Sequence, residues 1–74
     1  MDWKERIIID PEVMLGKPVI KGTRLTVEFI FCLIAAGWTI PRILENYPGT
    51  TREDILACAE FMEEMISKWK ESKQ

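Results

Sequence analysis

Histidine is absent from the sequence, and the two cysteines, Cys32 and Cys58, stand far apart in apolar surroundings. Structural zinc sites combine Cys and His ligands at short spacings, so the sequence predicts no bound metal. The two serines, Ser67 and Ser72, lie in the polar C-terminal turns, and neither cysteine has a basic neighbour along the chain. Nucleophilic catalysis requires such an activating neighbour. We therefore expect no enzymatic activity and no cofactor.

A long hydrophobic run is also missing. The longest run, residues 29–38, has ten residues, whereas about 20 are needed to cross a bilayer. The N-terminus reads Met-Asp-Trp-Lys-Glu-Arg and lacks the apolar stretch of a signal peptide. Both thiols are predicted to be buried and free, which fits a reducing compartment. We expect a cytoplasmic protein with no membrane association.

The chain has little length from which to build a core. Its 74 residues, 47% of them hydrophobic and 30% charged, have the composition of one globular domain spanning 1–74. A domain of this size buries only about 60% of the surface of its unfolded chain, so its own core is marginally sufficient. We therefore expect the chain to associate, with a homodimer as the simplest assembly.

A strong charge of either sign is absent as well. The formal net charge is −2, which gives no general affinity for nucleic acid or anionic membranes. The exception is the segment between Val13 and Val27, which carries Lys17, Lys21 and Arg24 and no acidic residue. These three side chains are the candidate contacts to a DNA backbone. The alternative is that they are simply solvated.

What the sequence does contain is a short extended region followed by helical patterns, which predicts a mainly α fold. Isoleucines at 7–9 and the Gly and Pro residues that follow are typical of a small β arm over 7–25. Such an arm is too small to be stable alone and needs the helices beside it. The helical unit is predicted to span 26–71.

Capping residues divide this unit into helices. Thr26 and Thr39 are favourable N-caps, Gly37 is typical of a helix end, and Thr51 with Asp54 matches a capping box. These signals predict three helices, over residues 27–36, 40–46 and 52–71.

The second and third predicted helices are joined by a short turn, which is the outline of a helix-turn-helix. The start of the third helix would offer Thr51 and Arg52 to the major groove of DNA, with Arg52 as the candidate guanine reader. Glu53 and Asp54 beside them oppose the approach of phosphates. The alternatives are that Arg52 pairs with a nearby acid and that Arg24 ties the arm to the helices.

The first predicted helix is apolar on all sides, although a helix of a small bundle normally leaves one face to water. The additional face must be covered by the β arm or by a second chain. The limited size of the domain favours the second chain.

The third predicted helix carries an apolar stripe in its far half, formed by Met62, Met65, Ile66 and Trp69. Two interpretations remain open. The stripe either extends the core of its own chain or binds in a groove of a partner, for which flexible methionines and one large aromatic residue are suited.

Most of the chain resembles the domain of unknown function 433 family, which is antitoxin-like. The resembling segments are residues 8–13, 16–27, 35–39, 43–48 and 53–55. The most specific of them is Gly-Lys-Pro-Val-Ile-Lys-Gly-Thr-Arg at residues 16–24. The resemblance implies a homeodomain-like three-helix helix-turn-helix bundle preceded by a short β arm. It also implies a VapB-type antitoxin role beside a PIN-like ribonuclease toxin.

The sequence and this resemblance together predict the antitoxin of a type II toxin-antitoxin pair, which binds its own promoter DNA and neutralises a PIN-like nuclease. The alternative is a protein-interaction module that never contacts DNA, consistent with an acidic pI of about 5.1.

Overall fold

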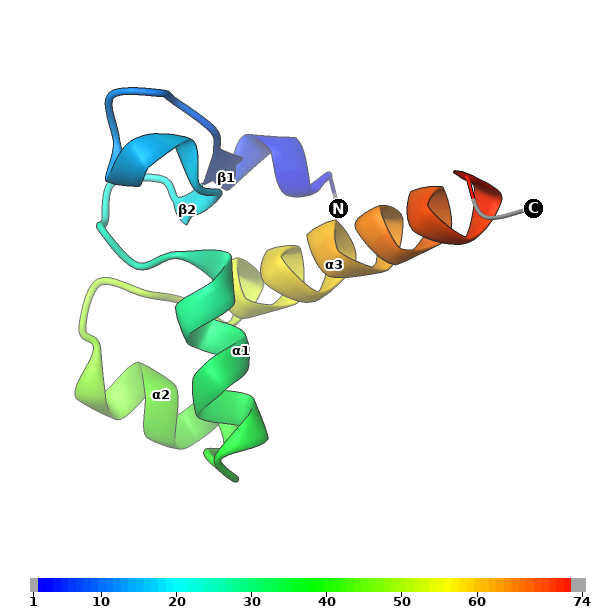
Figure 1. Ribbon diagram of the computed structural model, residues 1–74. Helices are drawn as coiled ribbons and strands as arrows, with labels where there is room; N and C mark the ends of the chain where they lie inside the picture. Colours follow the sequence, from blue (N-terminus) through cyan, green and yellow to red (C-terminus); the bar gives the residue numbers. More distant parts are fainter. Residues whose placement is uncertain (1, 73–74) are drawn as a thin grey trace.

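The computed structural model describes residues 2–72 and confirms a mainly α fold with three helices and a short β segment at the N-terminal side (Figure 1). No helix within residues 2–72 is both long and apolar enough to cross a membrane. In chain order the elements are the 3-10 turn η1 (Trp3–Glu5), β1 (Ile7–Ile8), the 3-10 turn η2 (Met14–Gly16), β2 (Val19–Ile20), α1 (Val27–Ala35), α2 (Ile40–Asn46) and α3 (Arg52–Ser72).

The predicted β arm is present as a two-stranded antiparallel sheet in which Ile7 pairs with Ile20 and Ile8 with Val19. Ile7, Val19 and Ile20 are buried, because the arm packs against α3 rather than standing free. Two turns that the sequence did not predict, η1 and η2, precede and interrupt the arm. The strands therefore close one side of the helical core.

The predicted helix boundaries are confirmed to within a residue. The Thr26 hydroxyl accepts the Phe29 backbone N–H at 3.0 Å, and the Thr39 hydroxyl accepts that of Arg42 at 3.3 Å. Gly37 adopts φ +93°, a left-handed conformation that suits glycine and ends α1. The caps thus fix where α1 and α2 begin.

The start of α3 is a reciprocal capping box. The Thr51 backbone N–H donates to Asp54 Oδ2 at 2.9 Å, and the Asp54 backbone N–H donates to Thr51 Oγ1 at 3.2 Å. The other carboxylate oxygen of Asp54 accepts a hydrogen bond from Arg6 Nη1 at 3.2 Å. Asp54 is only 7% exposed, so one buried carboxylate connects the helix to the residue that precedes β1.

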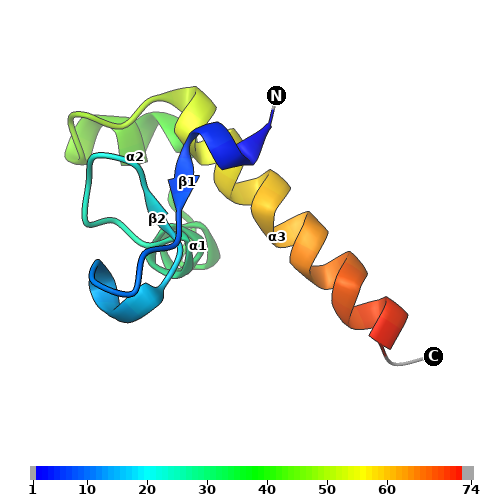
Figure 2. The same ribbon diagram turned by 90° about the horizontal axis from the view of Figure 1, so that it is seen from above.

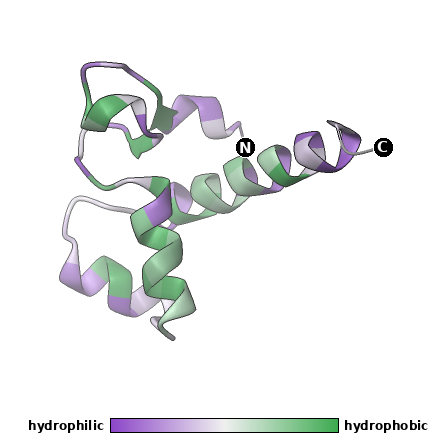
Figure 3. Cartoon of the chain, in the orientation of Figure 1, coloured by the Kyte–Doolittle hydropathy of each residue, from purple (hydrophilic) through white to green (hydrophobic). Residues whose placement is uncertain are grey.

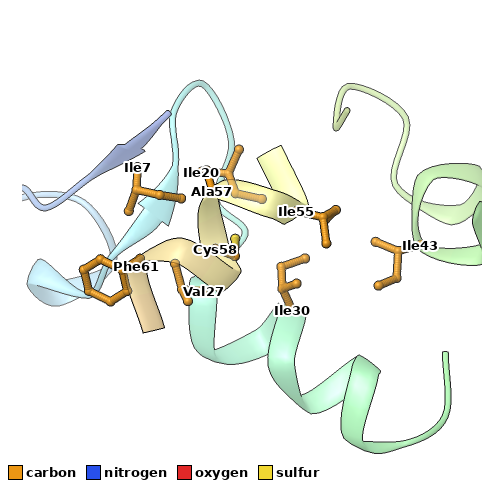
Figure 4. Close-up of a cluster of buried hydrophobic side chains, with 9 residues drawn as sticks. All are labelled: Ile7, Ile20, Val27, Ile30, Ile43, Ile55, Ala57, Cys58 and Phe61. Carbon is orange, nitrogen blue, oxygen red and sulfur yellow. The ribbon is translucent and has the colours of Figure 1, made fainter. Parts of the chain in front are cut away.

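The core is shared among the arm and all three helices (Figure 4). Isoleucine dominates it, and each element contributes at least one buried side chain. Its members are Ile7, Ile20, Val27, Ile30, Ile43, Ile55, Ala57, Cys58 and Phe61.

The N-terminal turn η1 contacts one side of α3 through hydrogen bonds and an aromatic pair. The Trp3 backbone N–H donates to Glu60 Oε1 at 3.1 Å, and Trp3 Nε1 donates to Glu64 Oε2 at 2.9 Å. The Trp3 ring meets the Phe61 ring edge-to-face, with centroids 4.8 Å apart. These contacts fix α3 as far along the chain as Glu64.

Aromatic contacts hold α2 against α1. Tyr47 contacts Phe29 edge-to-face at 5.7 Å between centroids and Trp38 at 6.3 Å. The guanidinium of Arg42 lies 4.0 Å above the centroid of the Trp38 ring, a cation–π contact. Arg42 is thus engaged with its own chain.

One sequence expectation is wrong, and one alternative role is not observed. Cys58 is buried, but Cys32 is exposed, because the side of α1 that carries it is not covered by the arm. Within residues 2–72 Arg24 makes no hydrogen bond or ion pair, and the tie between arm and helices is formed by Arg6 and Asp54 instead.

We predict that Asp54→Ala lowers the free energy of unfolding by about 2 kcal/mol, because it removes the carboxylate half of the capping box of α3 and leaves Arg6 without its partner. Urea denaturation followed by far-UV circular dichroism measures the change. Glu53→Ala is the matched control, since Glu53 is exposed in the same helical turn and contributes only to the helix dipole, at most about 1 kcal/mol. Equal losses in the two variants would contradict this role of Asp54.

Candidate binding surfaces

An apolar groove lies between α1 and α3. Val27, Phe31, Cys32 and Ala35 of α1 form one wall, and Phe61 and Met62 of α3 form the other. Pro18 and Glu28 also line the groove, whose volume is about 440 Å³. We call it the α1–α3 groove. It exists because α1 buries only Val27 and Ile30, so the apolar side chains on its other sides face outward.

A second hollow of about 470 Å³ continues along α3. It shares Phe31 and Met62 with the α1–α3 groove and extends to Ile66 and Lys70. The two hollows are therefore neighbours on one face of the molecule. Figure 3 shows hydrophobic residues on α1 and along α3.

The structure divides the predicted stripe of α3 into two parts. Met62 and Met65 are half-buried and pack against the core, as expected if the stripe extends the chain's own core. Ile66 and Trp69 are 49% and 59% exposed, as expected for a partner surface. The C-terminal turns of α3 project beyond the rest of the molecule in both views (Figures 1 and 2). The division arises because the other elements reach only the first half of the helix.

The basic side chains of the arm remain at the surface. Lys17, Lys21 and Arg24 are all exposed. Lys17 Nζ lies 3.4 Å from Glu28 Oε1, an ion pair between two exposed side chains that is worth little in water. In both views the chain around residues 21–25 lies on the side away from the projecting end of α3, as does the α2–α3 connection (Figures 1 and 2). Lys21 and Arg24 are thus the arm bases without an acidic partner among residues 2–72.

At the start of α3, Thr51 and Arg52 are both exposed. Arg52 forms no ion pair with any of the residues 2–72, so the predicted alternative of an acidic partner is not observed. The Thr51 hydroxyl already accepts a hydrogen bond from the Asp54 backbone, which leaves it less able to read a base. Asp54 is paired with Arg6, so of the two neighbouring acids only Glu53 points its charge to solvent.

The two thiols occupy opposite environments. Burial, together with the smaller effect of the Asp54 charge, raises the pKa of the Cys58 thiol from 9.0 to about 12. Cys58 is therefore a protonated core residue. Cys32 is exposed and lines the α1–α3 groove. Residues 2–72 contain no group of three His, Cys, Asp or Glu side chains that could hold a metal ion.

Sequence reasoning missed three residues that the structure makes prominent. Trp3 and Arg6 anchor the N-terminus to α3, and nothing in their local sequence indicated partners 48 or more positions away. Leu15 is 93% exposed and has φ +59°, next to Met14 with φ +49°. An apolar residue directly before the turn residue Gly16 was the only signal for Leu15.

The family described as "Protein of unknown function (DUF433)" matches the chain over residues 7–62. The match ends within α3, so the projecting turns lie outside it. The resemblance to this family that residues 8–55 suggested is thereby confirmed.

Two individual proteins are also similar in sequence to this chain. The chain is 32% identical over 60 residues to the uncharacterized protein y4eO of Sinorhizobium fredii, covering 81% of this chain and 27% of that protein. It therefore spans only about a quarter of this relative. An uncharacterized protein of Archaeoglobus fulgidus is 62% identical over 24 residues, which is 32% of this chain and 67% of that protein.

A solved structure has the same fold. The crystal structure of a DUF433 member from Anabaena variabilis superimposes with a TM-score of 0.79 at 30% identity. The superposition covers 90% of this chain and 66% of that one.

We predict that the two thiols differ sharply in reactivity. Ellman's reagent should modify Cys32 in the folded protein, whereas Cys58 should react only after unfolding, because it is buried and its pKa is raised to about 12. The variant Cys32→Ser should then show no rapid reaction. Rapid modification of Cys58 in this variant would contradict its burial.

The same shift predicts a dependence of stability on pH. The unfolded thiol ionises near its ordinary pKa of 9.0 and the folded one near 12, so the folded state is penalised as pH rises from about 9 towards 12. Unfolding free energies should therefore fall more steeply over this range in the wild type than in Cys58→Ala. Parallel curves would contradict the prediction.

Proposed function

This chain belongs to the DUF433 family, and we propose that it is a non-catalytic antitoxin that binds and neutralises a PIN-like ribonuclease through the projecting half of α3. The observation that carries the proposal is the exposed apolar pair Ile66 and Trp69 on those turns. Exposed apolar side chains at helical spacing are typical of a helix that binds in a groove of another protein.

The geometry of α3 supports this mode of binding. Trp3 and the core hold the helix up to about Met65, so the projecting turns are extended from a fixed base. A preformed helix loses less conformational entropy on binding than a disordered segment does. Trp69 is an aromatic side chain of the kind that dominates binding energy at protein interfaces.

The same proposal includes a homodimer. The α1–α3 groove leaves Phe31, Cys32 and Ala35 of α1 uncovered by the chain's own arm. The domain is small, and a second copy would bury this apolar surface.

Promoter binding is the second activity that we propose, and the exposure of Arg52 favours it. Arg52 is exposed at the start of α3, and the neighbouring Asp54 charge is compensated by Arg6. The segment 21–25, which carries Lys21 and Arg24, lies on the same side as the connection that leads into α3 (Figures 1 and 2). The alternative is an interaction module without DNA binding, consistent with the acidic pI of about 5.1.

We predict that the double substitution Ile66→Gln with Trp69→Gln weakens nuclease binding at least tenfold while the melting temperature changes little, since about half or more of each residue is exposed. The nuclease to use is a PIN-like protein encoded beside this chain, and the measurements are calorimetric affinity and residual ribonuclease activity. Lys68→Gln, an exposed change on the same turns, is the control. A neighbourhood without a nuclease gene, or unchanged inhibition by the double variant, would overturn the proposal.

For DNA we predict that Lys21→Glu weakens binding to all sequences alike, whereas Arg52→Ala relaxes the preference at one base pair per half-site. Lys21 and Arg24, the arm bases without an acidic partner among residues 2–72, give four phosphate contacts in a dimer, and hence a log-log salt slope of about −4. Fluorescence anisotropy with the chain's own upstream DNA measures both effects. Lys70→Glu, at the other end of α3, should change neither. Absence of binding at low salt would leave the interaction module as the function.

A further inference from the structure

The turn η2 presents an apolar side chain to water on a strained backbone. Met14, Leu15 and Gly16 have successive φ values of +49°, +59° and +81°. Residues other than glycine adopt this left-handed region at a steric cost, most readily when they are Asn or Asp. Leu15 is nevertheless 93% exposed, so it gains no burial in its own chain in return. Strain of this kind clusters at functional sites such as ligand clamps and switch regions, so an observed outlier suggests a function for the residue.

The turn is well defined by hydrogen bonds. The Gly16 backbone N–H donates to the Val13 carbonyl at 3.1 Å, and the Lys17 N–H donates to that of Met14 at 3.1 Å. The side chain of Asp10 accepts the Glu12 N–H at 2.9 Å. These hydrogen bonds fix the backbone on both sides of Leu15.

The α1–α3 groove lies beside this turn. Pro18, three positions after Leu15, lines the groove, and Lys17 reaches Glu28 on its rim at 3.4 Å. The Pro18 carbonyl accepts the Val27 backbone N–H at 2.9 Å, so the segment that follows η2 lies against the N-terminal end of α1. An apolar projection and an apolar hollow are thus adjacent on one surface.

We propose that Leu15 of one copy enters the α1–α3 groove of a second copy, while the second copy's Leu15 enters the groove of the first. The inference rests on the homodimer of the proposed function and names its contact. A two-fold axis requires a self-complementary patch, and a projection adjacent to a matching hollow is such a patch.

Charge complementarity supports a second copy as the occupant. Lys17 is two residues from Leu15, and Glu28 is the acidic residue among those that line the groove. When Leu15 enters the opposite groove, Lys17 comes beside the opposite Glu28, so the ion pair seen within one chain can be exchanged between two. The lining that Leu15 would meet, Phe31, Cys32 and Ala35 among others, is apolar and suits an aliphatic side chain.

The first test is Leu15→Asn, measured by light scattering coupled to size exclusion over a dilution series. Each Leu15 that leaves a groove should weaken association about tenfold, so the dimer dissociation constant should rise on the order of a hundredfold. Asn accepts the left-handed backbone, so the melting temperature of the dilute monomer should be unchanged or raised. Leu56→Asn, the same change at an exposed site on α3, is the control and should leave association unaffected.

The second test uses the exposed thiol of the groove. Leu15→Cys should form a disulfide with Cys32 of the second copy when treated with diamide, which gives a species of about twice 8.6 kDa on a non-reducing gel. The double variant Leu15→Cys with Cys32→Ala should stay monomeric on this gel. An intramolecular disulfide, or a linked dimer that persists without Cys32, would overturn the proposed contact.

The outcomes separate this inference from the rest of the function. A wild-type chain that stays monomeric at micromolar concentration overturns both the homodimer and the Leu15 contact, and leaves nuclease binding to its own test. A dimer that tolerates Leu15→Asn and forms no cross-link overturns only the contact. Loss of nuclease binding by Leu15→Asn with the dimer intact would assign Leu15 to the nuclease and also overturn it.

Discussion

The carboxylate of Asp54 makes the interactions on which the rest of the structure depends. One of its oxygens caps α3 through the Thr51 backbone, and the other binds Arg6. Arg6 directly precedes β1, so the pair fixes the β arm against α3 and allows Ile7 and Ile20 to complete the core. The same charge, buried nearby, helps to keep Cys58 protonated. Because Arg6 compensates the charge of Asp54, the start of α3 repels phosphates less than its sequence suggests.

The contacts between η1 and α3 then determine which surfaces the chain leaves uncovered. Trp3 donates hydrogen bonds to Glu60 and Glu64 and meets the Phe61 ring edge-to-face, so the chain's own N-terminus covers one side of α3. The neighbouring side faces α1, which is too apolar to be fully covered by so small a domain. The α1–α3 groove is the consequence. The last turns of α3 lie beyond the contacts with Trp3, so Ile66 and Trp69 remain exposed.

These surfaces differ in their chemistry. The α1–α3 groove, the hollow that continues it and the projecting turns of α3 are apolar and suit proteins. The basic arm and the connection into α3 lie on the side away from the projecting turns (Figures 1 and 2). In the proposed antitoxin, a nuclease on the projecting turns and DNA at the arm would therefore not compete for the same residues.

The sequence by itself determined where the three helices begin and end. Thr26, Thr39 and the Thr51–Asp54 box placed the three helices, because caps satisfy backbone groups within a few residues of one another. The apolar stripe of α3 was likewise readable from its spacing. Tertiary structure alone decided which part of that stripe is buried, that Cys32 is exposed, and that Arg6 rather than Arg24 ties the arm to the helices. These outcomes depend on contacts between residues about 50 or more positions apart, or on where a neighbouring element stops, and no local pattern encodes either.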